Sequence, residues 1–189
     1  GFGTDGEVIE FGIKENNYLG KGLALDSNLS VGSDKITGEF NIVNPNYNNS
    51  DKLVKFGLRA IEADRLSSFG YKSNKIGGLI GTKFEYLEDF KLGLETSSFI
   101  EDIETDSTAS DRQKKQQGNY FDTYISFDFD YDKRNQKYQT SDGFRSYYSV
   151  DLPIISDNNT VTNFYNYKIF SELYENNISS ISLSLSSAN

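Results

Sequence analysis

The sequence contains no cysteine, histidine or tryptophan, and only 2 of its 189 residues are proline. Without cysteine, the chain has neither disulfides nor a thiolate nucleophile. Without histidine, it lacks the usual general base near neutral pH and the commonest zinc ligand. Any catalysis would depend on carboxylates, lysine or tyrosine alone.

Apolar residues are also scarce, since they make up 36% of the chain and the mean hydropathy is -0.58. No apolar run reaches the ~18 residues of a transmembrane helix, and no basic-then-apolar signal segment opens the chain. We therefore expect an excised piece or a mature fragment. The net charge of -9 argues against nucleic acid as a partner, because binding phosphates requires a basic surface.

Aromatic residues are abundant, with 13 Tyr and 14 Phe, and they alternate with polar residues. The segment from Tyr120 to Asp132, YFDTYISFDFDYD, places Phe121, Phe127 and Phe129 on one face of a strand and Asp128 on the other. The same period of two recurs along almost the whole chain. It predicts roughly ten antiparallel strands of about ten residues each.

The connections between these strands differ in length. Two are long and polar, near residues 64–74 and 100–119, whereas the others are short and rich in Asn and Gly. In an up-and-down meander both long loops fall at one end of the sheet. This asymmetry is typical of outer-membrane barrels, which have short periplasmic turns and longer extracellular loops.

Alternating strands also build water-soluble sandwiches, in which the apolar face is inside. In that alternative the protein would be a carbohydrate-binding or adhesin domain, with Tyr165, Tyr167 and Tyr174 as stacking platforms. The predicted strands are about as long as a tilted crossing of a bilayer requires, and their polar face carries many charges and glycines. Both features favour the membrane interpretation. So do the aromatic residues near the short turns, as in an interfacial girdle: Tyr18, Tyr47, Tyr86, Phe90 and Tyr131.

Two apparent ligand-binding motifs fail on inspection. DFDYD resembles the start of a calcium loop, but Lys133 and Gln139 occupy the positions that need Gly and Glu. Gly1 and Gly3 form a Gly-x-Gly that no predicted helix follows, so it does not indicate a nucleotide site. We predict neither a metal nor a cofactor.

The three turns NYLGKG at residues 17–22, NPNY at 44–47 and DKRNQKYQTSDG at 132–143 resemble those of the BamA-type outer-membrane assembly factors, the bacterial surface antigen family. The first is an Asn-aromatic-Leu-Gly-x-Gly turn, formed here by Asn17, Tyr18, Leu19, Gly20 and Gly22. The second is an Asn-Pro-aromatic turn, formed by Asn44, Pro45 and Tyr47. The third is rich in Asp and Arg and closes on Thr and Gly, with the residues Asp132, Arg134, Thr140, Asp142 and Gly143.

The resemblance covers essentially the whole chain, with some departures. Gln139 stands where the family usually has proline, and the family's Arg-Gly-Phe motif, its periplasmic POTRA domains and its closing strands are not present. The resemblance implies an all-β fold: an antiparallel up-and-down transmembrane β-barrel that is partial, with about ten of roughly sixteen strands. Residues 1–189 would form the N-terminal part of one outer-membrane β-barrel domain, as an open, curved sheet.

The resemblance also implies a function and a location in the bacterial outer membrane. Family members fold and insert outer-membrane β-barrel proteins through a lateral gate, without covalent catalysis, and the resemblance therefore implies that the chain is not an enzyme. The gate edge would be Gly1, Phe2 and Gly3, paired to residues 8–14. Implied partners are unfolded outer-membrane proteins, assembly-machinery lipoproteins and the lipid bilayer. A porin or a protein-secretion barrel of the same superfamily is the alternative.

Overall fold

The computed structural model describes residues 2–3, 6–157, 159–175 and 177–188. It contains a single antiparallel sheet in which eleven strands follow one another in chain order. The strands are β1 (Phe2–Gly3), β2 (Gly6–Tyr18), β3 (Leu23–Gly32), β4 (Lys35–Asn44), β5 (Leu53–Arg65), β6 (Tyr71–Leu87), β7 (Phe90–Thr105), β8 (Gly118–Asp132), β9 (Gly143–Ile155), β10 (Thr162–Tyr174) and β11 (Asn177–Ala188).

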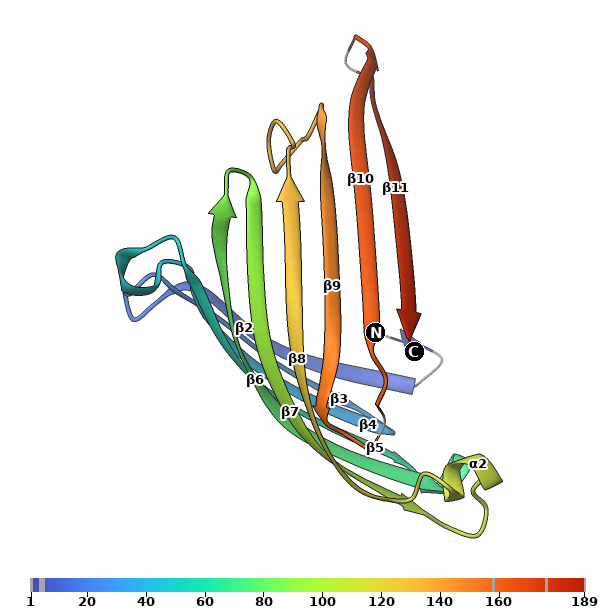
Figure 1. Cartoon of the computed structure of the whole chain (residues 1–189). Coiled ribbons are helices and arrows are strands. Elements are labelled where there is room, and N and C mark those ends of the chain that lie inside the picture. The colour runs from blue at the N-terminus through green and yellow to red at the C-terminus, as the bar shows by residue number, and fades with distance from the viewer. Residues whose placement is uncertain (1, 4–5, 158, 176, 189) are drawn as a thin grey trace.

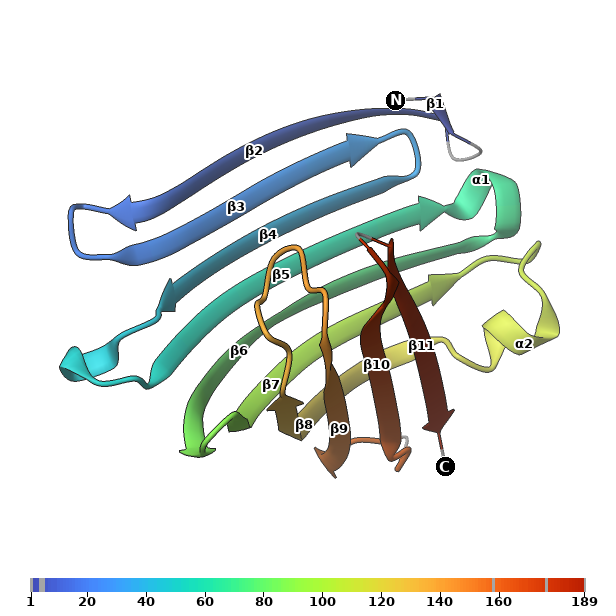
Figure 2. The ribbon, with the colours of Figure 1, turned by 90° about the horizontal axis from the view of Figure 1, so that it is seen from above.

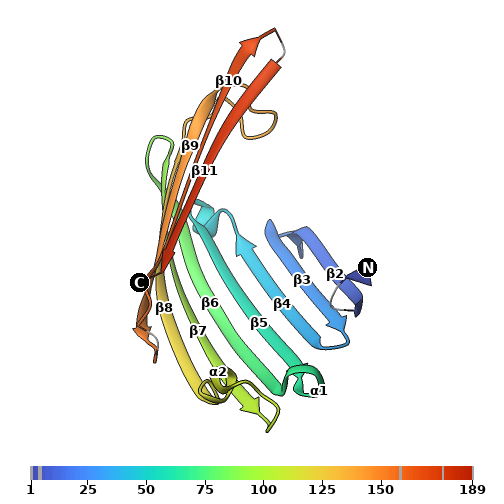
Figure 3. The ribbon, with the colours of Figure 1, turned by 90° about the vertical axis from the view of Figure 1, so that its right-hand side faces the viewer.

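The sheet is a curved, open wall (Figure 1). Seen from the side in Figure 3, β2 to β8 form a trough, and β9 to β11 continue it upward. Among the described residues, no pairing joins β1 to β11, so the sheet that they form is open. The predicted open, partial barrel is confirmed, although β6, with 17 residues, and β7, with 16, are longer than expected.

Exposure of the side chains distinguishes the two faces of this sheet. On β8, the apolar Phe121 is 49% exposed and Phe127 and Phe129 are each 36% exposed, whereas Asp130 is only 7% exposed. A water-soluble domain shows the opposite distribution. Within the described residues, Ala109 is the only buried apolar residue, so the sheet has no packed core on either face. The aromatic face therefore points outward and the charged face lines the concave side.

The outward apolar band has the same height on three neighbouring strands. It runs from Ile76 to Tyr86 on β6, and the ladder aligns this span with residues 90–100 of β7 and 121–131 of β8. About ten residues at ~3.3 Å each give roughly 33 Å of strand. With a tilt of about 40°, this corresponds to the ~25 Å apolar band of outer-membrane barrels.

An aromatic belt marks the tight-turn end of this band. The ring of Tyr131 lies edge-on to Phe90, with centroids 6.2 Å apart, and to Phe144, with centroids 5.6 Å apart. Tyr167 extends the row, 5.8 Å from Phe144. Two members of the predicted girdle, Phe90 and Tyr131, thus contact each other. Such rings are favoured at the level of the lipid headgroups.

The two long connections meet at the opposite end of the sheet, as Figure 2 shows. They carry the short helices α1 (Leu66–Phe69) and α2 (Asp111–Lys114), while the turn after β4 contains the 3-10 turn η1 (Tyr47–Asn49). The loops dock on each other because the Asp106 amide donates to the Gly70 carbonyl at 2.9 Å. The Thr108 hydroxyl, donating to the Asp106 carboxylate at 2.6 Å, lowers the pKa of Asp106. Among the described residues, no helix is long and apolar enough to cross a membrane.

Candidate functional site

The N-terminal edge of the sheet is the strand predicted as the gate. Phe2 pairs with Glu7 and Gly3 pairs with Gly6, while Gly1 lies outside the described residues. The predicted pairing with residues 8–14 is therefore wrong. The connection between the two strands is only two residues long, so the hairpin pairs the residues nearest its turn.

The apolar band on β2, next to this edge, is unusually short. Only Ile9, Phe11 and Ile13 form it, with exposures of 60%, 64% and 66%. Glu7 and Glu15 occupy the next outward positions of the alternating pattern at either end. The uncharged span is about 13 Å of strand at ~3.3 Å per residue, less than half of that on β6.

The first family turn follows β2 and is closed by its own side chain. The Asn17 carboxamide oxygen accepts from the Gly22 amide at 2.7 Å, and the Asn17 carbonyl accepts from the Gly20 amide at 2.9 Å. Gly20 and Gly22 both have φ of 67°, which explains why glycine is needed there. Leu19 adopts φ of 56° and is exposed. The motif is a self-contained hairpin turn, after Tyr18 ends the strand.

The second family turn follows β4 in the same manner. The Asn44 carboxamide oxygen accepts from the Asn46 amide at 3.1 Å, just after Asn44 ends the strand before Pro45. The Tyr47 amide donates to the Lys52 carbonyl at 2.9 Å, and the Ser50 hydroxyl donates to the Tyr47 carbonyl at 2.6 Å. Both family turns thus lie at the tight-turn end.

The third family turn forms an ordered loop between β8 and β9. Arg134 donates two hydrogen bonds of 2.7 Å to the Asp132 carboxylate, which raise the pKa of Arg134. Thr140 is buried and its hydroxyl donates to the Gln136 carbonyl at 2.7 Å. The Asp142 carbonyl accepts from the Asn135 amide at 3.1 Å.

The departure from the family pattern at Gln139 has a conformational reason. Gln139 has φ of 53°, in the left-handed region, whereas proline is held near -65°. The Gln136 side chain donates to the Gln139 carbonyl at 2.7 Å and so fixes this conformation. This loop thus follows a backbone path that proline at this position could not adopt.

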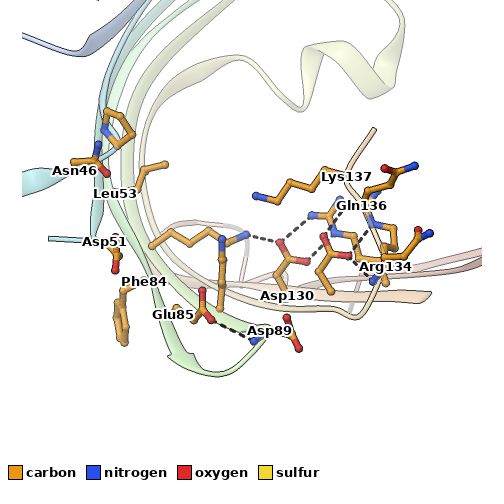
Figure 4. A pocket seen from close by; sticks show the side chains of 16 residues that line it. Asn46, Asp51, Leu53, Phe84, Glu85, Asp89, Asp130, Arg134, Gln136 and Lys137 are labelled. Atoms are coloured by element: carbon orange, nitrogen blue, oxygen red, sulfur yellow. Dashed lines mark hydrogen bonds and ion pairs between the residues drawn. The ribbon is translucent and has the colours of Figure 1, made fainter. Parts of the chain in front are cut away.

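A charged network that the sequence interpretation missed lies on the concave face beside this loop (Figure 4). The Asp130 carboxylate accepts from Lys83 at 2.8 Å and from Arg145 at 2.7 and 2.9 Å. Tyr147 donates to Asp128 at 2.7 Å. The network borders a hollow of about 820 Å³. In Figure 4, Asp130 and Lys137 face this hollow, whereas the Phe84 ring points away from it.

Two lysines of the concave face reach across an intervening strand beside a glycine. Lys55 on β5 forms an ion pair with Glu95 on β7, and a Cβ on Gly81 of β6 would lie 2.8 Å from the Lys55 Cε. Lys83 on β6 passes β7 beside Gly93, its direct ladder partner, to reach Asp130 on β8. Gly81 makes room for the Lys55 ion pair, whereas a Cβ on Gly93 would lie 2.9 Å from the Asp128 side chain; each ion pair braces three strands at once.

We expect Asp130→Asn to lower the unfolding free energy by about 1–2 kcal/mol, because Lys83 and Arg145 lose their shared counter-charge while the hydrogen-bond acceptors remain. Urea unfolding of the protein in detergent measures the change. Asp151→Asn on β9, also on the concave face, is the matched control, since Asp151 takes part in no ion pair among the described residues. Equal effects of the two substitutions would contradict a stabilising role for the network.

An open meander with an exposed apolar band, an aromatic belt and a charged concave face is the wall of a transmembrane β-barrel. The soluble-sandwich alternative is wrong, because no second sheet among the described residues covers the apolar face, on which Tyr165 and Tyr167 also lie. Residues 17–187 match the Omp85 superfamily domain. The chain belongs to the Omp85 superfamily.

Among solved structures, the chain is similar to the crystal structure of BamA from Haemophilus ducreyi lacking POTRA domains 1-3. The TM-score is 0.73 at 19% sequence identity, and the match covers 98% of this chain. It covers 39% of the other chain, so the present chain spans well under half of that protein. A comparison with curated proteins finds no match. Membership of the Omp85 superfamily places the chain in the bacterial outer membrane, and the likeness to the solved structure shows its fold.

Proposed function

We propose that this chain forms the seam side of an outer-membrane β-barrel that folds and inserts other β-barrel proteins. The observation that carries the proposal is the short apolar band on β2, formed by Ile9, Phe11 and Ile13 between two charged residues. Charged residues at Glu7 and Glu15 draw water and headgroups toward the midplane, because burying an unpaired carboxylate in hydrocarbon is costly. The bilayer is therefore thin and easily disturbed at this edge.

The edge acts by strand addition. An edge strand presents unpaired N–H and C=O groups, and an incoming strand can satisfy them with its own backbone. Gly3 weakens the pairing of β1 with β2, since glycine in a strand loses more entropy and packs no side chain. Gly1, Phe2 and Gly3 thus serve as the lateral-gate edge, and the reaction is an exchange of backbone hydrogen bonds without covalent catalysis.

The partners follow from this mechanism. Unfolded outer-membrane proteins are the substrates and the lipid bilayer is the surrounding solvent, while assembly-machinery lipoproteins are partners that the family resemblance implies. Residues 1–189 contribute the N-terminal part of the barrel domain. The three family turns, from Asn17, Asn44 and Asp132 onward, set the periplasmic rim.

Disulfide crosslinking tests this function, and the absence of native cysteine from the 189 residues makes each introduced cysteine unique within them. We expect Phe2→Cys in the full-length protein to crosslink to a stalled substrate barrel that carries one cysteine in its terminal strand. Val150→Cys, in the middle of β9, is the control for random collision and should form no adduct. A protein that crosslinks at neither position, yet conducts ions as an open pore, would be a porin instead.

A further inference from the structure

Side-chain bonds join the strands of the wall from β4 to β11. Arg59 on β5 donates to Glu39 on β4 at 2.9 Å, and Lys75 on β6 pairs with Glu101 on β7 at 3.1 Å. The Lys55 and Lys83 braces each span three strands, and further polar contacts link the remaining neighbours. Those contacts are Arg145 to Asp130, Tyr148 to Asn163 and Asn166 to Ser184.

The strand β3 differs from all of these. Among the residues that the structure describes, no side chain of β3 forms a hydrogen bond or an ion pair, so only backbone bonds join it to β2 and β4. Asp26 lies directly opposite Lys14 in the ladder, yet the two are not paired. The concave-face side chains of β3 are all short and cannot reach across a strand: Ala24, Asp26, Asn28, Ser30 and Gly32.

We propose that β3 is the hinge on which the seam edge moves, and that the lysine braces beside Gly81 and Gly93 hold the wall from β4 onward as one body. A pair of strands joined only by its backbone ladder can change its twist without breaking a side-chain bond. A pair of strands that an ion pair also joins can change its twist only if the ion pair breaks or the neighbouring strand moves as well. Bending therefore concentrates where bracing is absent.

This inference rests on the proposed function, because a gate edge that opens needs a place where the wall yields. A hinge at β3 confines the movement to β1 and β2. The charged network around Asp130 then stays intact during opening, together with the ordered loop that begins at Arg134. Gly81 is a positioning residue, which acts by admitting the Lys55 side chain.

Two spin-label pairs compare the flexibility of the sheet across β3 with that of the wall from β4 onward. The distance distribution of each pair is measured on the full-length protein in lipid nanodiscs, without substrate. The hinge pair is Ile13→Cys with Ile80→Cys, from β2 to β6, and the wall pair is Phe56→Cys with Val150→Cys, from β5 to β9. Both pairs face lipid and both are four strands apart. We expect the hinge-pair distribution to be about twofold wider than the wall-pair distribution. Equal widths would overturn the proposal.

Reciprocal variants test the cause. Asn28 lies opposite Glu39 in the ladder, so Asn28→Lys adds a brace between β3 and β4 and should narrow the hinge pair, while Asn28→Gln should not. Glu95→Gln removes the counter-charge of Lys55 and should widen the wall pair only. If Asn28→Lys leaves the hinge pair as wide as Asn28→Gln does, bracing does not set the hinge.

These distances are independent of insertion activity. A uniform wall together with crosslinking at Phe2 would overturn the hinge and leave the assembly function standing. A wide hinge pair without any substrate crosslink would support the hinge and contradict the gate. Hydrogen exchange of the unmodified protein gives a second measurement, in which amides of β3 should exchange faster than those of β6.

Discussion

Replacing Phe127 with arginine is expected to block stable insertion of the barrel and to cost about 2–4 kcal/mol. Phe127 lies on the outward face near the middle of the β8 band, between Phe121 and Tyr131. A guanidinium there would leave water for hydrocarbon without a counter-ion. The fraction of protein that becomes resistant to urea extraction from outer membranes measures the loss.

The matched control is Asp128→Asn, the next residue on the strand but on the opposite face. Its carboxamide oxygen can still accept the hydrogen bond that Tyr147 now donates to Asp128 at 2.7 Å, so insertion should be nearly unchanged. Fluorophores at Phe121 and Phe129 give an independent test. Lipid-bound quenchers should reach them and water-soluble quenchers should not, and quenching by neither would mean that the aromatic face is covered by protein.

The second large effect is expected for Gly143→Ala at the start of β9. Gly143 has φ of 98°, which costs an L-residue about 1–3 kcal/mol. An added Cβ would also lie 2.9 Å from the Arg134 Cα and press on the Lys133 carbonyl, for a further ~1–3 kcal/mol. We expect the urea midpoint of the folded barrel in detergent to fall. The size of the fall checks the combined backbone and steric cost.

Gly38→Ala provides the comparison for that result. Gly38 lies within β4 with nothing within 4 Å of an added Cβ, so alanine there should be neutral or slightly stabilising through the unfolded state. A Gly143→Ala protein as stable as the Gly38→Ala protein would show that the loop after β8 can relax. The strain argued from its backbone would then be absent.

The sequence predicted the faces of the sheet better than its pairings. Alternation at Phe127 and Asp128 reports which side a residue takes, because the side-chain period of a strand is two. The turns at Asn17 and Asn44 were also predictable, since Asn and Gly there satisfy local backbone bonds and left-handed conformations. The resemblance added the barrel, which alternation alone could not separate from a sandwich.

The register and the charged network were beyond the sequence alone. Shifting a strand by two residues preserves the alternation, so nothing in the pattern around Lys83 indicates that Gly93 is its partner or that Asp130 is within reach. The misplaced pairing of Phe2 has the same origin. The sequence did show that the polar face carries glycines. The role of Gly81 could be assigned only once the structure placed the Lys55 side chain beside it.

The unequal lengths of the strands shape the outer surface of the barrel. β6 and β7 continue past Ile76 and Ile100, to Tyr71 and Thr105, for roughly 16 Å of strand at ~3.3 Å per residue. At a tilt of about 40°, the two strands extend ~12 Å beyond the apolar band along the barrel axis. This extension carries the docked loops of α1 and α2 clear of the hydrocarbon, on the side where outer-membrane barrels have their longer, extracellular loops. These loops therefore contact water while the apolar band contacts lipid, so a substitution in them does not meet the constraint that hydrocarbon places on the band.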